Sequence, residues 1–546
     1  MPNRRFTPLV IAVSLVCGIL LGAFLTSKFS RNRLSIINTS SNKISDLLHI
    51  VDARYVDTIS ISQIVEQAMP QLIAQLDPHS TYIPASEAEE VNQELKGSFS
   101  GIGVQFTIRN DTVVLSDIIR AGPAEKAGAL AGDRLIAVDG NPYTGDSVTN
   151  RKTMSLLRGE KGTTVRLTLL RGQQTKEISI TRDDIPVHTV EAAYMLSANL
   201  GYIKITSFGE TTYAELLTAL TQLQAKNFRG LVLDLRDNGG GYLGAAVQVV
   251  NEFLPNNHLI VYTEGRKARR QEYSSDGRGS YQQMPLIVLT DEQTASAAEI
   301  VSGAIQDNDR GILIGRRTFG KGLVQEPIDF ADGSLLHLTV ARYYTPSGRC
   351  IQKPYQQGKT EEYLQDLNSR YQHGEYFSSD SIHLSGPEYT TSIGRTVYGG
   401  GGIMPDYFVP EDTSLVTPWL TECLRAGLTL DFCFQYNDQH RTQLKQCKDW
   451  EKLLKHLRSE RVVQQFIDYT DQQQFPRRNN QIRKSQPLIE RAIYAGIIYN
   501  ALGFEEYTKY YNSDDPAVAL AIQLFDAHQT KPTLNATQPA AETDVP

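Results

Sequence analysis

The chain has 546 residues, of which 40% are hydrophobic and 21% are charged, a composition typical of a globular protein with buried cores. At roughly 150 residues per domain, this length predicts three or four domains. The formal net charge of −7, with no basic patch between aromatic residues, argues against a nucleic-acid-binding protein, so no nucleic acid is expected among its partners.

The N-terminus carries an uncharged stretch, Phe6–Ser27, directly after Arg4 and Arg5. Its apolar part is long enough to cross a bilayer as a helix. We interpret 7–27 as an uncleaved transmembrane anchor, because Gly22–Ser27 offers only a poor cleavage site; a cleaved signal peptide is the alternative. The localisation expected from this anchor is the inner membrane, single-pass, with the catalytic part in the periplasm.

Residues 34–96 are predicted to be helical, because apolar residues recur at helical spacing up to Val51 and again from Ile64 to Leu76. The sequence Asp77-Pro78-His79-Ser80 ends this pattern. A small, independent β-rich domain is predicted next, over 97–182. Its five strand patterns are Gly103–Ile108, Val113–Ile118, Arg134–Val138, Thr164–Leu170 and Glu177–Thr181.

From residue 187 to residue 410, strand and helix patterns alternate, which predicts a largely parallel sheet covered by helices. Within this domain the polar segment 351–398 is interpreted as an insertion or long loop near the site. Residues 411–528 are predicted to form a helical C-terminal region. Residues 529–546 have little apolar content and three prolines, so we expect a disordered tail.

The five cysteines show no CxxC pair and no zinc-binding spacing, so no metal site is expected. They are Cys17, Cys350, Cys423, Cys433 and Cys447. The last three lie close together in the sequence. One disulfide among them and buried free thiols are both open interpretations.

Ser296 lies where a hydrophobic strand pattern, Leu286–Thr290, gives way to a helix of small residues. The first amides of a helix are unpaired and its dipole is positive there, so this position can stabilise an oxyanion. A serine at a helix start is usually only an N-cap. On this segment alone, the N-cap interpretation is favoured.

Lys321 stands between Gly320 and Gly322, after the strand pattern Gly311–Gly315. The glycine spacing superficially matches a phosphate-binding loop. That motif needs a Ser or Thr and then a helix, whereas a glycine and a strand pattern follow here, so nucleotide binding is rejected. Close packing around the glycines would desolvate the amine, lower its pKa and let it accept a proton from a serine. Taken alone, Lys321 is more often a surface or structural lysine.

Two further segments supply candidates. Gln325 shares a strand face with Lys321 if the alternation holds, and it could then hold the amine by a hydrogen bond. Gly239–Gly241 follow the buried strand pattern Leu231–Leu235, at the end of a parallel strand where such folds bind ligands. A flexible turn is the equally frequent interpretation of the glycines.

Together these segments resemble the carboxy-terminal processing proteases, also called tail-specific proteases. The resemblance is carried by Thr294–Glu299, Thr318–Gly322 with Gln325, Leu233–Gly240, Leu76–Tyr82 and Gly401–Asp406. It covers residues 40–410 and is specific, because several motifs occur in the family's order. The insertion 351–398 and the region 411–528 lie outside the common core and resemble longer members of the family.

The resemblance implies that Ser296 is a nucleophile, that Lys321 is its general base and that Gln325 orients the lysine. It also implies an oxyanion hole formed by the amides of Ala297 and of a glycine in the 239–241 run, for which Gly240 is favoured.

The resemblance further assigns 97–182 as a PDZ domain, whose groove binds a peptide as an added strand and captures its C-terminal carboxylate. The carboxylate-binding loop would comprise Gly101, Ile102, Gly103 and Val104. Arg158 matches an arginine that in relatives couples peptide binding to activation.

The predicted fold is multidomain α/β: an N-terminal membrane helix, a helical N-terminal segment, a β-rich PDZ domain, an α/β protease core over 187–410 and a helical C-terminal region. The predicted function is that of an extracytoplasmic serine endopeptidase that recognises protein C-terminal tails and uses a Ser-Lys acyl-enzyme mechanism without a cofactor. The expected partners are proteins or peptides with accessible C-termini and the membrane, and homo-oligomerisation stays open. The alternatives are a non-catalytic PDZ scaffold and a nucleotide-dependent protease.

Overall fold

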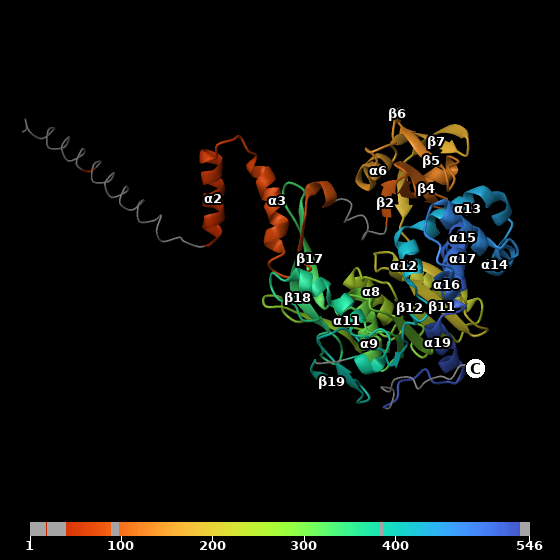
Figure 1. Ribbon diagram of the computed structural model, residues 1–546. Helices are drawn as coiled ribbons and strands as arrows, with labels where there is room; N and C mark the ends of the chain where they lie inside the picture. The colour runs from red at the N-terminus through yellow and green to blue at the C-terminus, as the bar shows by residue number, and fades with distance from the viewer. Residues whose placement is uncertain (1–17, 19–39, 89–97, 120, 383–385, 535–546) are drawn as a thin grey trace, which may run out of the picture. The chain divides into compact units, whose positions relative to one another are not determined.

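A computed structural model describes residues 18, 40–88, 98–119, 121–382 and 386–534 (Figure 1). The chain divides into two compact units, with the boundary after Ile73. The predicted anchor at 7–27, apart from Gly18, and residues 535–546 of the predicted tail lie outside the described residues.

The first unit contains two helices, α2 (Ser40–Arg54) and α3 (Ile61–Ile73), which confirms the helical prediction for this stretch. Helix α3 buries none of its residues and therefore forms no core of its own. It continues through Pro70. Among the described residues, no helix combines the length and the apolar character that a bilayer crossing requires.

The predicted β-rich domain is a small antiparallel sheet in the order β3-β4-β5-β7-β8, closed by a short strand pair and two helices. Its sheet strands are β3 (Val104–Arg109), β4 (Thr112–Ile118), β5 (Arg134–Val138), β7 (Thr164–Arg171) and β8 (Gln174–Thr181), with β6 (Asn141–Pro142) beside β5. The strand pair is β2 (Ser98–Gly101) with β9 (Asp183–Pro186), and the helices are α5 (Pro123–Lys126) and α6 (Asn150–Leu157).

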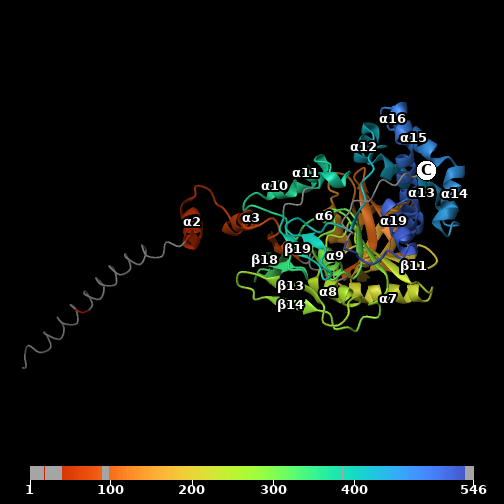
Figure 2. The same ribbon diagram turned by 90° about the horizontal axis from the view of Figure 1, so that it is seen from below.

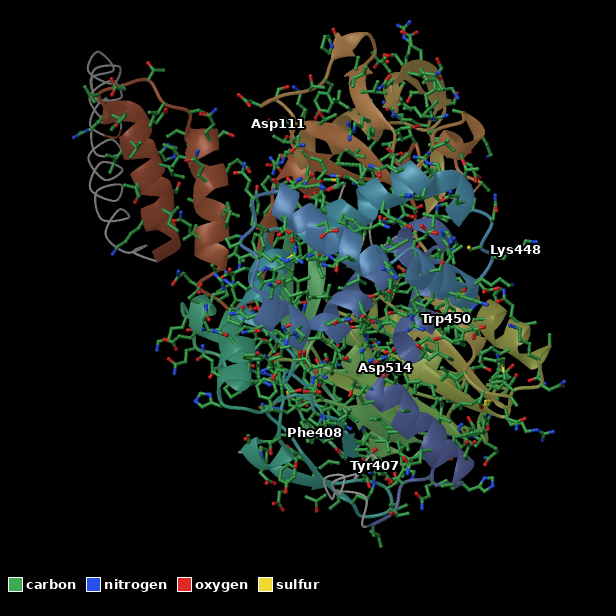
Figure 3. The ribbon with its side chains drawn as sticks, turned by 45° about the vertical axis from the view of Figure 1, so that its right-hand side comes forward. Asp111, Tyr407, Phe408, Lys448, Trp450 and Asp514 are labelled. Atoms are coloured by element: carbon green, nitrogen blue, oxygen red, sulfur yellow. The ribbon has the colours of Figure 1, made fainter. Side chains whose placement is uncertain are left out.

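The predicted α/β core contains a six-stranded sheet in the order β10-β11-β12-β15-β16-β21. All neighbouring strands are parallel except the edge pair β10 and β11. The strands are β10 (Val190–Met195), β11 (Leu200–Ile205), β12 (Gly230–Asp234), β15 (Leu286–Thr290), β16 (Ile312–Gly315) and β21 (Tyr407–Phe408). Figure 3 labels Tyr407 and Phe408 on the edge strand.

Helices cover both faces of this sheet, because its strands are apolar on both sides. Leu231 and Leu233 pack against α7 (Thr212–Gln224), α8 (Leu243–Asn251) and α9 (Ala297–Asp307). Val232 faces the opposite side, where it packs against α19 (Pro516–Asp526) (Figure 2). The helix α19, which was predicted to belong to a separate C-terminal region, therefore completes the core of the protease sheet.

A second, antiparallel sheet has the order β1-β18-β13-β14, with β17 also paired to β18. Its strands are β1 (Thr81–Ile83), β13 (Leu259–Glu264), β14 (Gln271–Ser274), β17 (Leu323–Asp329) and β18 (Leu335–Tyr344). Residues 81–83 were included in the predicted helical stretch 34–96, and this part of the prediction is wrong. Pairing with β18 decides their conformation, and such a distant partner leaves no local pattern.

The insertion after β18 contains helices α10 (Thr360–Leu364) and α11 (Asp366–Gln372), a 3₁₀ turn at Ser379–Ser381, and the hairpin β19 (Glu388–Thr390) with β20 (Thr396–Tyr398). The helical C-terminal region has its own apolar core around Trp419 and Phe466. Its helices are α12 (Pro418–Arg425), α13 (Leu428–Leu444), α14 (Trp450–Ser459), α15 (Val462–Gln472), α16 (Asn479–Lys484), α17 (Gln486–Leu502) and α18 (Phe504–Asn512).

Candidate active site

Ser296 occupies the N-cap position of α9, after the short turn that follows β15. Its backbone has φ 55° and ψ −117°, a conformation that a non-glycine residue adopts only under strain. A strained turn from strand to helix also presents the nucleophile in α/β-hydrolases. Beside it, the amide of Ala297 donates no hydrogen bond to any described residue. Ser296 therefore combines the N-cap position with a strained backbone and a free amide beside it.

Glu299 lies one turn into α9, and its fully buried carboxylate accepts four hydrogen bonds. Its Oε2 accepts the amides of Ser296 (2.9 Å) and Lys321 (2.8 Å). Its Oε1 accepts the amide of Gly320 (2.8 Å) and the hydroxyl of Thr318. Burial raises the pKa of Glu299 to about 7, although these hydrogen bonds favour the charged form. One carboxylate oxygen thus joins the backbones of the serine and the lysine.

Tyr343 on β18 makes a second connection between the same two residues. Its hydroxyl lies within donor distance of the carbonyl oxygens of Ser296 (2.9 Å) and of Lys321. Burial, with the nearby charge of Glu299, raises the pKa of Tyr343 well above its ordinary value, so the hydroxyl keeps its proton. Sequence reasoning missed both connecting residues; the spacing of Glu299 behind Ser296, typical of a capping box, was the available signal.

Lys321 is half-buried in the loop between β16 and β17. Burial lowers the pKa of its amine below the ordinary lysine range, and the carboxylates of Glu299 and Asp77 oppose this shift only in part. Its Nζ donates no hydrogen bond to any described residue, so none joins it to the Ser296 hydroxyl. Catalytic hydrogen bonds are often long in free enzymes and shorten in the substrate complex.

Among the described residues, Gln325 makes no hydrogen bond to Lys321, although one was expected. Its Nε2 lies 3.3 Å from the hydroxyl of Thr339, which in turn donates to Asp77 Oδ1 at 3.1 Å. A register shift in the β17–β18 pairing falls between Val324 and Gln325. The extra residue of this shift, Val340, lies on β18 and does not interrupt β17. The expected alternation from Lys321 to Gln325 fails because Lys321 lies in the loop before β17, which begins at Leu323.

Asp77 and His79 come from the segment that ends the N-terminal helical pattern, and both lie near the lysine. Asp77 accepts the amides of His79 and Ser80 at 2.8 Å each. His79 Nε2 lies 2.7 Å from the Tyr363 hydroxyl. Burial, then the positive charge of Lys321, lowers the pKa of His79 to about 4, so the imidazole is neutral at neutral pH. Sequence reasoning had not given either side chain a role.

The glycine run packs directly against the serine. A Cβ atom on Gly240 would lie 2.6 Å from the Cβ of Ser296 and 3.0 Å from the amide nitrogen of Ala297. The Gly240 amide is already engaged, since it donates to Asn238 Oδ1 at 2.8 Å. The Gly239 amide donates to no described residue. Gly240 therefore lies nearer to Ser296, whereas Gly239 has the free donor, so the choice of Gly240 as the oxyanion donor stays a prediction.

Buried charges hold the chain just before the glycine run. Arg236 donates to Asp234 and to Asp515, each at 2.7 Å. Although burial alone would raise it, the charges of Arg236 and Lys204 hold the pKa of Asp234 well below its usual range. Because Asp515 caps α19, the C-terminal region reaches the edge of the site.

The predicted peptide groove lies between the edge strand β3 and helix α6, and its cavity measures about 360 Å³. Its lining includes Ile102, Gly103, Val104, Met154, Leu157 and Arg158. Gly101 ends β2 beside this lining. The Arg158 guanidinium lies 4.9 Å from the centre of the Phe99 ring, at the same end of the groove. An edge strand with a groove beside it can accept a peptide as an added strand.

No metal-ligating group of three or more His, Cys, Asp or Glu side chains occurs within the described part of the chain. The described cysteines are free thiols: Cys350, Cys423, Cys433 and Cys447. Of the two interpretations left open for the last three, the structure therefore has free thiols. Burial raises the pKa values of Cys423 and Cys433 to about 12.

Comparison with known proteins assigns three segments. Residues 199–360 match peptidase family S41, residues 100–181 match the PDZ domain, and residues 419–503 match a family of unknown function, DUF8443. A carboxy-terminal-processing protease of Bartonella bacilliformis is 37% identical over 317 residues, which are 57% of this chain and 72% of that protein.

Two further relatives are similar. The carboxy-terminal processing protease CtpA of Bacillus subtilis is 33% identical over 382 residues, which are 69% of this chain and 80% of that protein. Among solved structures, a photosystem II D1 C-terminal processing protease is 32% identical; the match covers 56% of this chain and 89% of that one, with a TM-score of 0.32.

Proposed function

Because the chain belongs to the carboxy-terminal processing proteases of peptidase family S41, it is a serine endopeptidase, and we propose that Ser296 is its nucleophile and Lys321 its general base. The observation that carries this proposal is the shared oxygen: Oε2 of Glu299 accepts the amides of both residues. Two amides that share one acceptor atom hold their backbones close together, as a nucleophile and its base require.

In the first half of the proposed reaction, the neutral amine of Lys321 takes the hydroxyl proton of Ser296 while Oγ attacks the carbonyl carbon of the scissile bond. The oxyanion accepts hydrogen bonds from the amide of Ala297 and from a glycine amide, either Gly239 or Gly240. Lys321 then gives its extra proton to the leaving nitrogen as the C–N bond breaks. The products are an ester on Ser296 and a free amine.

In the second half, Lys321 takes a proton from water while the water oxygen attacks the ester carbonyl. The tetrahedral intermediate collapses, Oγ of Ser296 leaves, and Lys321 returns the proton to it. Gln325 enters this scheme indirectly, since it reaches Asp77 through Thr339. The Asp77 carboxylate is a negative charge near the lysine.

We also propose that the PDZ domain selects substrates by their C-terminal carboxylate, with Arg158 coupling occupancy of the groove to cleavage.

The localisation is likewise a proposal: a single-pass inner-membrane protein with the catalytic part in the periplasm, supported by the apolar stretch at 7–27. Digestion of a C-terminal tag by protease added to spheroplasts tests it; a tag that is cleaved only after lysis would contradict it.

The first prediction concerns pH. A fluorophosphonate should label Ser296 of the full-length chain, and the labelling rate should rise with pH and level off above the pKa of Lys321. Burial places that pKa below the ordinary lysine value of about 10.4, so more of the amine is neutral at any given pH. The pH midpoint of the labelling rate should fall on heating, because the pKa of an amine falls with temperature and that of a carboxyl group hardly changes.

The matched control for this titration is Lys359→Met, because Lys359 is an exposed lysine. It should leave the profile unchanged, whereas Lys321→Met should remove the lysine-like step. Labelling of a different serine, or a temperature-sensitive midpoint that survives Lys321→Met, would exclude the Ser-Lys mechanism.

The second prediction concerns the tail. Amidating the C-terminal carboxylate of a protein substrate should lower kcat/KM by roughly tenfold to a hundredfold, since a charge-assisted hydrogen bond of about 1.5–3 kcal/mol is lost. Met154→Glu, which places a negative charge in the groove lining, should have the same effect through KM.

Ser155→Glu is the control for the groove variant, because it adds the same charge at an exposed position on the same helix. It should leave KM unchanged. Equal cleavage of free and amidated tails would mean that the domain does not read the carboxylate.

A further inference from the structure

The insertion packs against the loop that carries the lysine. We call residues 316–322, between β16 and β17, the lysine loop. On the side of the protease core, Glu299 of α9 accepts hydrogen bonds from this loop. On the opposite side, helix α11 of the insertion contributes Arg370, a buried arginine that donates to two residues of the lysine loop. No role had been assigned to this insertion.

Arg370 binds two consecutive carbonyl groups of the lysine loop. Its Nη2 donates to the carbonyl oxygen of Arg317 at 2.8 Å, and its Nη1 donates to that of Thr318 at 3.1 Å. Within the described chain, no other donor reaches these two oxygens. A carbonyl left unsatisfied in a buried place costs free energy, so loss of Arg370 would destabilise this path of the loop.

Glu375 fixes the arginine that makes these contacts. Its Oε1 accepts hydrogen bonds from Nε of Arg370 (2.8 Å) and from Nε of Arg317 (2.7 Å). Although burial alone would raise it, hydrogen bonding from Arg317 and the charge of Arg370 hold the pKa of Glu375 below its usual range. The carboxylate therefore stays charged at neutral pH and ties the two guanidinium groups together.

A lysine at the start of the insertion contacts the middle of the same loop. The Lys353 ammonium lies 4.0 Å from the ring centre of Phe319 and 4.2 Å from that of Tyr363. Its amide donates to the carbonyl oxygen of Gly320 at 2.9 Å. From Arg317 to Gly320, the outer side of the lysine loop is thus held by the insertion.

We propose that the insertion fixes the path of the lysine loop and that Arg370 is a positioning residue for Lys321. The inference rests on the proposed function, in which Lys321 is the base. Two glycines flank Lys321, so the loop has little conformational preference of its own and depends on outside contacts for its path. Arg370 acts through the Arg317 and Thr318 carbonyls, and Thr318 is the residue whose hydroxyl binds Glu299.

The test replaces Arg370 in the full-length chain with glutamine. We expect kcat to fall roughly tenfold to a hundredfold with KM nearly unchanged, because a displacement of about 1 Å in a catalytic group costs that much. The pH midpoint of fluorophosphonate labelling should move up, since a loosened loop exposes the amine to water. Arg370→Lys, which keeps the charge and one donor group, should give an intermediate kcat.

Arg310→Gln is the matched control. Arg310 also donates to three backbone carbonyls, those of Phe253, Tyr281 and Met284, each at 2.7 Å, and none belongs to the lysine loop. Loss of this arginine should lower the melting temperature without moving the pH midpoint. Chemical rescue adds specificity: guanidinium ion at low concentration should raise the activity of Arg370→Ala and leave that of Arg310→Ala unchanged.

The outcomes separate the inference from the function beneath it. If Lys321→Met leaves the labelling titration intact, the proposed function fails whatever Arg370 does. If Lys321→Met removes the titration while Arg370→Gln and Arg370→Lys keep the wild-type kcat and midpoint, only the inference fails. A fall in kcat with an unmoved midpoint and no guanidinium rescue would reduce Arg370 to a structural residue. If Arg370→Gln does not fold, Arg370→Lys and the rescue of Arg370→Ala decide the matter.

Discussion

Replacing Ser296 by alanine is expected to slow the degradation of unfolded casein by roughly 10⁴-fold or more, because removal of a nucleophile leaves only oxyanion and binding effects. Lys321→Ala should cause a loss of similar size, since an uncharged base is needed to activate the hydroxyl. The double variant should be no slower than the slower single variant, because residues that act as a unit are not additive.

Casein cleavage by the full-length chain, followed by fluorescence of a labelled substrate, measures this loss. Ser302→Ala is the control: it removes a serine hydroxyl from the same helix, where Oγ donates to the carbonyl oxygen of Ala298 at 2.8 Å. Its activity should stay near wild type. If the Ser296 and Lys321 variants degrade casein as fast as the wild type, the assigned site is wrong, and a tail-binding scaffold becomes the better description.

Glu299→Gln should lower kcat by roughly 10²-fold to 10³-fold, on the scale of a lost oxyanion donor or a displaced catalytic group. The NH₂ group of a glutamine would replace one of the two carboxylate oxygens, and each of these oxygens now accepts two hydrogen bonds. Whichever way the amide turns, either Ser296 and Lys321 or Thr318 and Gly320 lose their acceptor. In the first orientation Ser296 and Lys321 are no longer tied together, and in the second the loop that carries Lys321 loses its anchor at Thr318 and Gly320.

Glu252→Gln is the control for this substitution, because Glu252 is another buried glutamate, bound by Tyr213 and Ser280 and outside the site. It should reduce stability without a comparable loss of kcat. Full activity of Glu299→Gln would show that the shared carboxylate does not hold the site together.

Glu299→Gln should also change how the free energy of unfolding depends on pH. Burial raises the pKa of Glu299 to about 7 from its ordinary value of about 4.5, so the carboxyl group binds its proton more tightly in the folded state. The stability that this tighter proton binding contributes is fully present below the unfolded pKa of about 4.5, and it is lost as the pH rises from there through about 7. Urea denaturation should therefore show the wild type losing stability relative to Glu299→Gln over that range.

Much of the fold follows from local sequence. The strand at Leu286–Thr290 was predicted to the residue and a helix of small residues directly after it, because continuous apolar runs and small-residue helices are local patterns. The five strands of the PDZ domain were predicted for the same reason. The strand at 81–83 and the start of β17 only after Lys321 were not, because both are set by pairing with β18.

The sequence by itself determined which chemistry this chain carries: a serine at a helix start, a lysine between glycines, a glycine run after a buried strand, and the domains around them. Only the tertiary structure decided how these parts are joined. Glu299, Tyr343 and Arg370 bind backbone groups contributed by distant segments. The physical reason is that a backbone amide or carbonyl has the same chemistry at every residue, so no motif marks which one a buried side chain will bind.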